Sequence, residues 1–194
     1  MHKTGNDHFL LTPGPLTTSL RTKEAMLRDW GSRDPRFIEL STQIRRQVVC
    51  IMGATDTHVC IPLQGSGTFA VEAALGTLVP KDGKVLVLVN GAYGHRMVKI
   101  LQRLGKSYTM LETPEYAPND PARLDEALSH DPSLTHVAMV YCETTTGILN
   151  PLQEIAAITE KHSRRLLIDA MSAFGALPLD ASQITFDAVM ASSN

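Results

Sequence analysis

The sequence predicts an α/β protein with a mostly parallel β-sheet and helices on both of its faces. Short apolar runs, rich in β-branched residues, alternate with longer segments whose apolar residues recur at helical spacing. Glycine-containing or polar loops follow the apolar runs, as they do at the carboxyl ends of parallel strands. The composition, 43% hydrophobic and 20% charged over 194 residues, is that of an ordinary globular domain.

Two helices are expected before the first strand, over residues 18–30 and 36–52, because both segments have apolar residues at helical spacing. Residues 57–63 (THVCIPL) are short, β-branched and followed by a glycine loop, and are expected to form the first strand. From there helices and strands alternate, which is the pattern of a βαβ series. The expected helices are 69–79, 94–104, 121–129 and 151–161, and the expected strands are 84–89, 107–111, 136–141, 164–168 and 187–190.

Charge and composition exclude several classes of protein. Eighteen Lys and Arg against twenty Asp and Glu give a net charge of -2, without the basic footprint of a nucleic-acid binder. No apolar run is long enough to span a bilayer, and we expect a cytoplasmic protein. Three cysteines without CxxC spacing are expected to be buried free thiols, and seven histidines without zinc-site spacing predict no metal.

The loop at 64–68 (QGSGT) joins an expected strand to an expected helix, where backbone N–H groups and the helix dipole favour a phosphate. The same residues also read as G-x-G-x-x-A over 65–70, the fingerprint of a dinucleotide site. That interpretation needs an acidic residue at the end of the next strand, and the sequence offers Asn90. A tight turn that only caps a helix is the simplest alternative.

Three further loops carry candidate site residues. Tyr93 follows the strand at 84–89 and could stack on a flat ring or pack over the sheet edge. Thr144 and Thr145 follow the strand at 136–141, either as hydroxyl donors or as part of a solvated turn. Asp169 ends an apolar strand, where a buried charge is costly without a partner such as a protonated ring nitrogen. Together these groups describe a site for a phosphorylated pyridine cofactor.

The motifs occur in an order that is specific where each motif alone is not. They are LLTPGP at 10–15, GSGT at 65–68, NGAYGHR at 90–96, ETTTG at 143–147 and IDA at 168–170. With these motifs the chain resembles, over its whole length, the class V branch of the fold-type I pyridoxal-phosphate aminotransferases. The resemblance implies pyridoxal 5'-phosphate as the cofactor and the large domain of that family as the fold.

The resemblance also implies roles for single residues. Ser66, Gly67 and Thr68 would bind the cofactor phosphate, with Asn194 helping to hold it. Tyr93 would stack on the pyridine, and Thr144 or Thr145 would bond its 3' oxygen. Asp169 would pair with the ring nitrogen and keep it protonated. The implied cofactor-binding residues are Ser66, Gly67, Thr68, Tyr93, Thr144, Thr145, Asp169 and Asn194.

The implied reaction is a transamination, most similar to the branch that moves the amino group of 2-aminoethylphosphonate to pyruvate and gives phosphonoacetaldehyde and L-alanine. Alanine:glyoxylate or serine:pyruvate transamination is the near alternative. Gly14 and Arg33 are candidate substrate residues, since a guanidinium can bind phosphonate oxygens in a bidentate way. A surface Arg33 paired with Asp34 is the alternative. Full-length relatives are expected to be homodimers with active sites at the subunit interface.

The lysine that forms the Schiff base in this family is expected immediately after Asn194, past the last residue of the sequence. We therefore expect residues 1–194 to be an N-terminal segment plus an incomplete cofactor-binding large domain, truncated and without the small C-terminal domain. Such a chain is expected to be inactive on its own. A catalytically inactive cofactor-binding fragment and a nicotinamide dehydrogenase are the alternatives from other classes.

Overall fold

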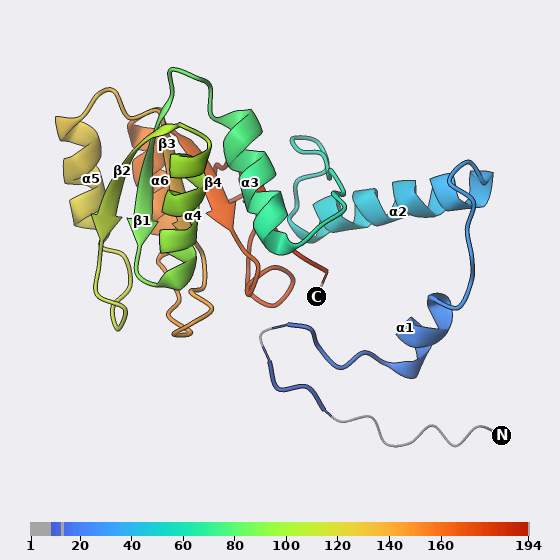
Figure 1. Ribbon diagram of the computed structural model, residues 1–194. Helices are drawn as coiled ribbons and strands as arrows, with labels where there is room; N and C mark the ends of the chain where they lie inside the picture. The colour runs from blue at the N-terminus through green and yellow to red at the C-terminus, as the bar shows by residue number, and fades with distance from the viewer. Residues whose placement is uncertain (1–8, 13, 194) are drawn as a thin grey trace.

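Five short apolar strands build a sheet in which every neighbouring pair runs parallel (Figure 1). The computed structural model describes residues 9–12 and 14–193. The strands lie in the order β2-β1-β3-β4-β5, so the chain changes direction across the sheet between β1 and β3. Their bounds are β1 Lys84–Val89, β2 Ser107–Glu112, β3 His136–Val140, β4 Arg165–Asp169 and β5 Ala188–Met190.

Helices cover both faces of the sheet, because successive strand residues point to opposite faces and are apolar on each. Leu86, Met139 and Ile168 pack with α5, α6 and the end of α2, while Val87 and Leu167 pack with α3 and α4. The predicted fold class is therefore confirmed. The helices of the described residues are α1 Leu20–Ala25, α2 Pro35–Ile51, α3 Gly67–Leu78, α4 Ala92–Arg103, α5 Pro121–His130 and α6 Leu152–Lys161.

Most helices begin where the sequence provides a start signal. Ser66 caps α3, and its hydroxyl accepts a hydrogen bond from the Phe69 N–H. Asp34 and Asp120 cap α2 and α5, each directly before a proline in the first helical position. The start of α4 differs, because its cap residue, Gly91, has no side chain to accept a bond.

Two predicted elements are wrong in part. Helix α1 covers Leu20–Ala25 instead of 18–30 and buries no residue, since it lies apart from the sheet and has no core to pack against (Figure 1). Residues 57–63 form no strand among the described elements. Val59 and Ile61 are 74% and 71% exposed, and no strand beside them supplies ladder hydrogen bonds.

The prediction of buried thiols is also wrong. All three cysteines are free, but Cys50 is exposed and Cys60 and Cys142 are partly exposed. Cys50 lies near the end of α2, a helix whose buried residue is Val49, and Cys142 begins the loop after β3. Apolar neighbours in sequence therefore did not predict burial. Among the described residues, no helix has the length and apolarity that a bilayer crossing requires.

Candidate functional site

The candidate site lies at the carboxyl edge of the sheet, where β1, β3 and β4 end beside the start of α3. In parallel sheets, ligands bind outside the carboxyl ends of strands at the point where the strand order reverses, here between β1 and β3. A small hollow at this edge is lined by Gly67, Thr68, Tyr93 and Asp169 together with neighbouring side chains. Residues predicted from three separate loops therefore share one lining.

The start of α3 is shaped to receive an anion. A Cβ added to Gly67 would lie 2.6 Å from the sulfur of Met171, so the glycine leaves room that a side chain would remove. Free N–H groups and the positive end of the helix dipole favour a phosphate at such a position. The Thr68 hydroxyl accepts a hydrogen bond of 3.0 Å from the Arg96 guanidinium, which brings a cation to the same place.

Asp169 is the most perturbed carboxyl of the site. It is 2% exposed, and its Oδ1 accepts a hydrogen bond of 3.0 Å from the Met171 N–H. Burial raises the pKa of Asp169 to about 6; the Met171 N–H lowers it, the Glu143 carboxylate raises it further, and Arg96 lowers it. A carboxyl in this environment favours a cationic partner, such as a protonated ring nitrogen.

Tyr93 is partly buried at the start of α4 and lines the same hollow as Asp169. The Arg96 guanidinium lies over this ring, 4.3 Å from its centroid. Arg96 is exposed and Met171 partly so, and together they fill much of the hollow, which measures about 10 Å3. That volume is close to the space of one water molecule, so a larger ligand would require these two side chains to turn away.

The loop after β3 distinguishes the two candidate threonines. The Thr145 hydroxyl donates a hydrogen bond of 2.8 Å to the Glu143 carboxylate. The Thr144 hydroxyl is buried and has no hydrogen-bond partner among the described residues. Thr144 is therefore the hydroxyl that is available to a ligand oxygen. Glu143, which is fully buried, was not predicted as a site residue, although a charged residue shortly after an apolar strand was the available signal.

Two predicted site residues, both candidates for substrate binding, are not brought to this edge. Gly14 and Arg33 are exposed in the N-terminal arm, and Arg33 precedes a 17-residue helix whose far end meets the sheet (Figure 1). Asp34 pairs with Arg36 at 3.1 Å rather than with Arg33. Asn194 lies outside the described residues. A dinucleotide site would need an acidic residue at position 90, where this chain has asparagine. The Asn90 amide has a structural partner instead, since it donates a hydrogen bond to the buried Asn150 side chain.

The residues at this edge fit pyridoxal 5'-phosphate by the chemistry of their donors and acceptors. A helix start suits its phosphate, an aromatic ring suits its pyridine, and the orphaned Thr144 hydroxyl suits its 3' oxygen. The buried carboxylate of Asp169 suits its protonated nitrogen. Within the described part of the chain, no group of three His, Cys, Asp or Glu side chains could hold a metal ion.

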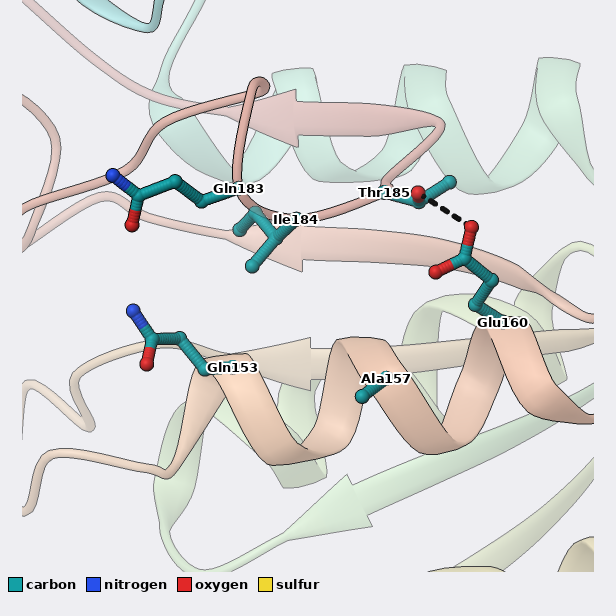
Figure 2. Close-up of a pocket in the computed structure, with 6 residues that line it drawn as sticks. All are labelled: Gln153, Ala157, Glu160, Gln183, Ile184 and Thr185. Carbon is teal, nitrogen blue, oxygen red and sulfur yellow. Dashed lines mark hydrogen bonds between the residues drawn. The ribbon is translucent and has the colours of Figure 1, made fainter.

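A larger hollow of about 230 Å3 lies elsewhere, between α6 and the loop that leads to β5 (Figure 2). Its polar lining includes Gln153, Gln183 and Glu160, whose carboxylate accepts a hydrogen bond of 2.9 Å from the Thr185 hydroxyl. None of the residues that the sequence predicts to be functional lines this hollow.

The chain matches the family model described as aminotransferase class-V over residues 19–194. It is 58% identical over 188 residues to a Pseudomonas putida protein named 2-aminoethylphosphonate--pyruvate transaminase, a match covering 97% of this chain and 51% of that protein. A Pseudomonas fluorescens protein of the same name is 59% identical, over 95% of this chain and 50% of its own length. The chain spans about half the length of the curated relatives it matches.

Among solved structures, a pyridoxamine-pyruvate aminotransferase from Mesorhizobium loti superimposes with a TM-score of 0.89 at 25% identity. The match covers 99% of this chain and 49% of the other. The parallel sheet with helices on both faces is thus an arrangement found in a protein of known structure.

Proposed function

This chain belongs to the class-V aminotransferase family, and we propose that it is the cofactor-binding part of an enzyme that transfers the amino group of 2-aminoethylphosphonate to pyruvate. The products would be phosphonoacetaldehyde and L-alanine. The name of its relatives supports this choice of substrates over alanine:glyoxylate or serine:pyruvate transamination. Residues 1–194 would comprise the N-terminal segment and part of the large domain.

One observation carries the proposal: Gly67, Thr68, Tyr93 and Asp169 line the same hollow at the carboxyl edge of the sheet. These residues come from three loops that are far apart in sequence, and each suits a different part of pyridoxal phosphate. A turn that only caps a helix would not require a buried carboxylate and an aromatic ring beside it. The convergence therefore supports a cofactor site more strongly than any single motif.

The bound cofactor would supply an electron sink for the carbanion that forms at the amine carbon of the substrate. The chain's own residues would bind and orient it. Ser66, Gly67 and Thr68 would hold the phosphate at the start of α3, and the ring of Tyr93 would fix the pyridine plane. Thr144 would donate a hydrogen bond to the 3' oxygen, since the Thr145 hydroxyl already donates to Glu143.

Asp169 would hold a proton on the pyridine nitrogen. Its burial makes an unpaired negative charge costly, which is why its pKa is raised to about 6. A cationic ring nitrogen within hydrogen-bond reach would stabilise the carboxylate, and the carboxylate would stabilise the protonated ring. The residue that moves a proton at the amine carbon would be a lysine, and no lysine lines the hollow among the described residues.

We further propose a homodimer in which the N-terminal arm covers a second copy of the chain. Phe9, Leu11 and Leu27 in this arm are 84%, 95% and 83% exposed. Exposed apolar side chains at this density are typical of interaction surfaces. Light scattering would test this proposal, because a monodisperse monomer at micromolar concentration would contradict it.

The experiment that tests the cofactor proposal is an absorbance titration of the 194-residue chain with pyridoxal phosphate, followed by borohydride reduction and peptide mapping. We expect saturable binding of pyridoxal phosphate, weaker binding of free pyridoxal, and no adduct at a single lysine. A reducible adduct at one lysine would show that a lysine of this chain reaches the cofactor, which the lining of the hollow does not lead us to expect. Absence of binding would overturn the proposed function itself.

Substrate choice is tested by adding amines to the chain loaded with pyridoxal phosphate. 2-Aminoethylphosphonate is expected to raise the melting temperature of the complex, whereas L-alanine and L-serine at equal concentration are expected to change it less. A larger shift with L-serine would favour the serine:pyruvate alternative. Inorganic phosphate serves as the control for simple anion binding.

A further inference from the structure

Glu143 is a fully buried carboxylate at the site to which the proposed mechanism assigns no role. We infer that Glu143 is a positioning residue that sets the width of the slot for the cofactor ring, by joining the first turn of α4 to the loop after β3. The inference rests on the proposed function, because the slot matters through the ligand it holds. The hydrogen-bond partners of the Glu143 side chain are Tyr93, which lines the hollow, and Thr145 in the loop after β3.

One oxygen of Glu143 accepts from both elements. Its Oε1 accepts from the Thr145 hydroxyl at 2.8 Å and from the Thr145 N–H at 3.3 Å. The same oxygen accepts from the Tyr93 N–H at 3.4 Å. Tyr93, in the first turn of α4, carries the expected stacking ring, and Thr145 belongs to the loop that carries the Thr144 hydroxyl. A single carboxylate therefore ties the start of α4 to the loop after β3.

The start of α4 explains why a carboxylate can be buried here. Its cap residue, Gly91, offers no side-chain acceptor for the free N–H groups of the first turn. Glu143 supplies that acceptor from another part of the chain, and a negative charge is stabilised at a helix N-terminus. Within the described residues no cation forms a salt bridge with Glu143. The start of α4 is therefore the group that stabilises its buried charge.

Gly91 fits the carboxylate closely. A Cβ at this position would lie 2.4 Å from Cγ, 2.5 Å from Cδ and 2.9 Å from Oε2 of Glu143. The glycine is thus required by contact with Glu143 and not by a left-handed backbone, since its φ is 166°. The second oxygen, Oε2, is buried without a hydrogen-bond partner. The side chain is held in place by packing as well as by its three hydrogen bonds.

The arrangement also assigns the two threonine hydroxyls. Because Thr145 donates its proton to Glu143, its hydroxyl has no proton left for a ligand. The Thr144 hydroxyl, buried without a partner among the described residues, keeps its proton for a ligand. Glu143 would thus act on the cofactor through Tyr93 and through the orientation of the Thr144–Thr145 loop, without touching the cofactor.

The test compares E143A and E143Q in the 194-residue chain, with affinities for pyridoxal phosphate, pyridoxal and inorganic phosphate measured separately. E143A is expected to lower the affinity for pyridoxal phosphate and for pyridoxal about 10-fold. The affinity for inorganic phosphate should stay unchanged, since the phosphate site at α3 does not contact Glu143. E143Q is expected to lose about 3-fold or less, because its amide oxygen can accept the same hydrogen bonds. Hydrogen exchange at the Tyr93 and Thr145 amides should rise in E143A.

E160A is the matched control, because Glu160 also accepts a threonine hydroxyl but lies at the other hollow (Figure 2). It is expected to change none of the three affinities. The inference is wrong if E143A binds pyridoxal as tightly as the parent chain, or if its affinity for inorganic phosphate falls as much as its affinity for pyridoxal. Failure of the parent chain to bind pyridoxal phosphate would instead overturn the proposed function, so the two failures are distinguishable.

Discussion

The two edges of the sheet treat their carboxylates in opposite ways. At the amino edge, where strands begin, Asp131 pairs with Lys84 at 2.7 Å and Asp187 pairs with Arg165 at 2.5 Å. At the carboxyl edge, Asp169 and Glu143 are buried and form no salt bridge within the described residues. The two carboxylates at the amino edge are paired with cations of the chain, whereas at the carboxyl edge Asp169 has no cationic partner among the described residues and Glu143 is held by hydrogen bonds to Tyr93 and Thr145.

The pKa values follow this difference. Hydrogen bonds from Lys84 and from Ser133 lower the pKa of Asp131 to about 2. Burial raises the pKa of Asp169 to about 6. Because perturbed carboxyls that lack a charged partner are typical of functional sites, the direction of the shift separates a structural edge from a functional one.

The largest expected effect comes from D169N. Loss of the carboxylate should lower the affinity for pyridoxal phosphate roughly 100-fold, since one buried charge-assisted hydrogen bond is lost and the protonated ring nitrogen loses its anionic partner. The amide oxygen can still accept from the Met171 N–H, so the local backbone should be kept. An absorbance titration measures the affinity, and an unchanged dissociation constant would contradict the role of Asp169.

The same variant is expected to stabilise the ligand-free chain at neutral pH. The folded pKa of about 6 lies above the ordinary value of 3.8, so between these values the folded state holds a proton that the unfolded state releases. Stability therefore falls as pH rises through this window, by up to about 3 kcal/mol. Urea unfolding at pH 4 and pH 7.5 should show an advantage of D169N at the higher pH alone.

G91A should have the next largest effect, because the added Cβ would overlap the Glu143 carboxylate. Overpacking of this kind costs about 1–3 kcal/mol. G31A is the control, since nothing lies within 4 Å of its added Cβ. Combining G91A with E143A should relieve part of the cost, and additive free energies of unfolding in the double-mutant cycle would show that the contact is not the cause.

At the amino edge, D131N should lower the melting temperature at pH 7. The pKa of Asp131 is depressed from 3.8 to about 2, so its contribution is present above pH 4 and is lost as pH falls toward 2. The difference between parent and variant should therefore shrink on acidification, as it does for D169N, but with the opposite sign, because D131N is expected to destabilise the chain at neutral pH and D169N to stabilise it. Melting curves between pH 3 and pH 7 measure it, and a difference that grows at low pH would contradict the assignment.

Much of the fold and several site residues could be predicted from the sequence, because the spacing of apolar residues and the residues that start and end helices are local features. The strands of the sheet and the helices from α2 onward follow apolar spacing and cap residues, and Ser66, Tyr93 and Asp169 follow from their places at element boundaries. The segment at 57–63 could not be assigned in this way. Its β-branched residues are typical of a strand, but a strand also needs a neighbour, and none pairs with it among the described residues.

The site residues that were missed depend on contacts between distant loops. Glu143 is recognisable through its bonds to Tyr93 and Thr145, and Arg96 through its contact with Thr68. Spacing along the chain does not encode which of two adjacent threonines points inward. The hydrogen bond from the Thr145 hydroxyl to Glu143 is what distinguishes Thr144 from Thr145.

The smallest expected effect is that of K161A, which removes one of the two side chains that bond Asp125 across the helix pair α5 and α6. Lys161 is 63% exposed and bonds Asp125 at 2.8 Å, while His162 contacts the same carboxylate at 2.5 Å. Exposed ion pairs are screened by solvent, and His162 remains, so the melting temperature should change by about 1 °C or less. Salt at about 0.5 M should abolish that change.

A loss as large as that of D131N would mean that helix contacts, rather than pairs at the strand starts, stabilise the amino edge. The contrast to the carboxyl edge would then lie in the contacts between α5 and α6 and not in the ion pairs at the strand starts. With the small effect expected for K161A, the partly buried pair at the start of β1 remains the structural counterpart of Asp169.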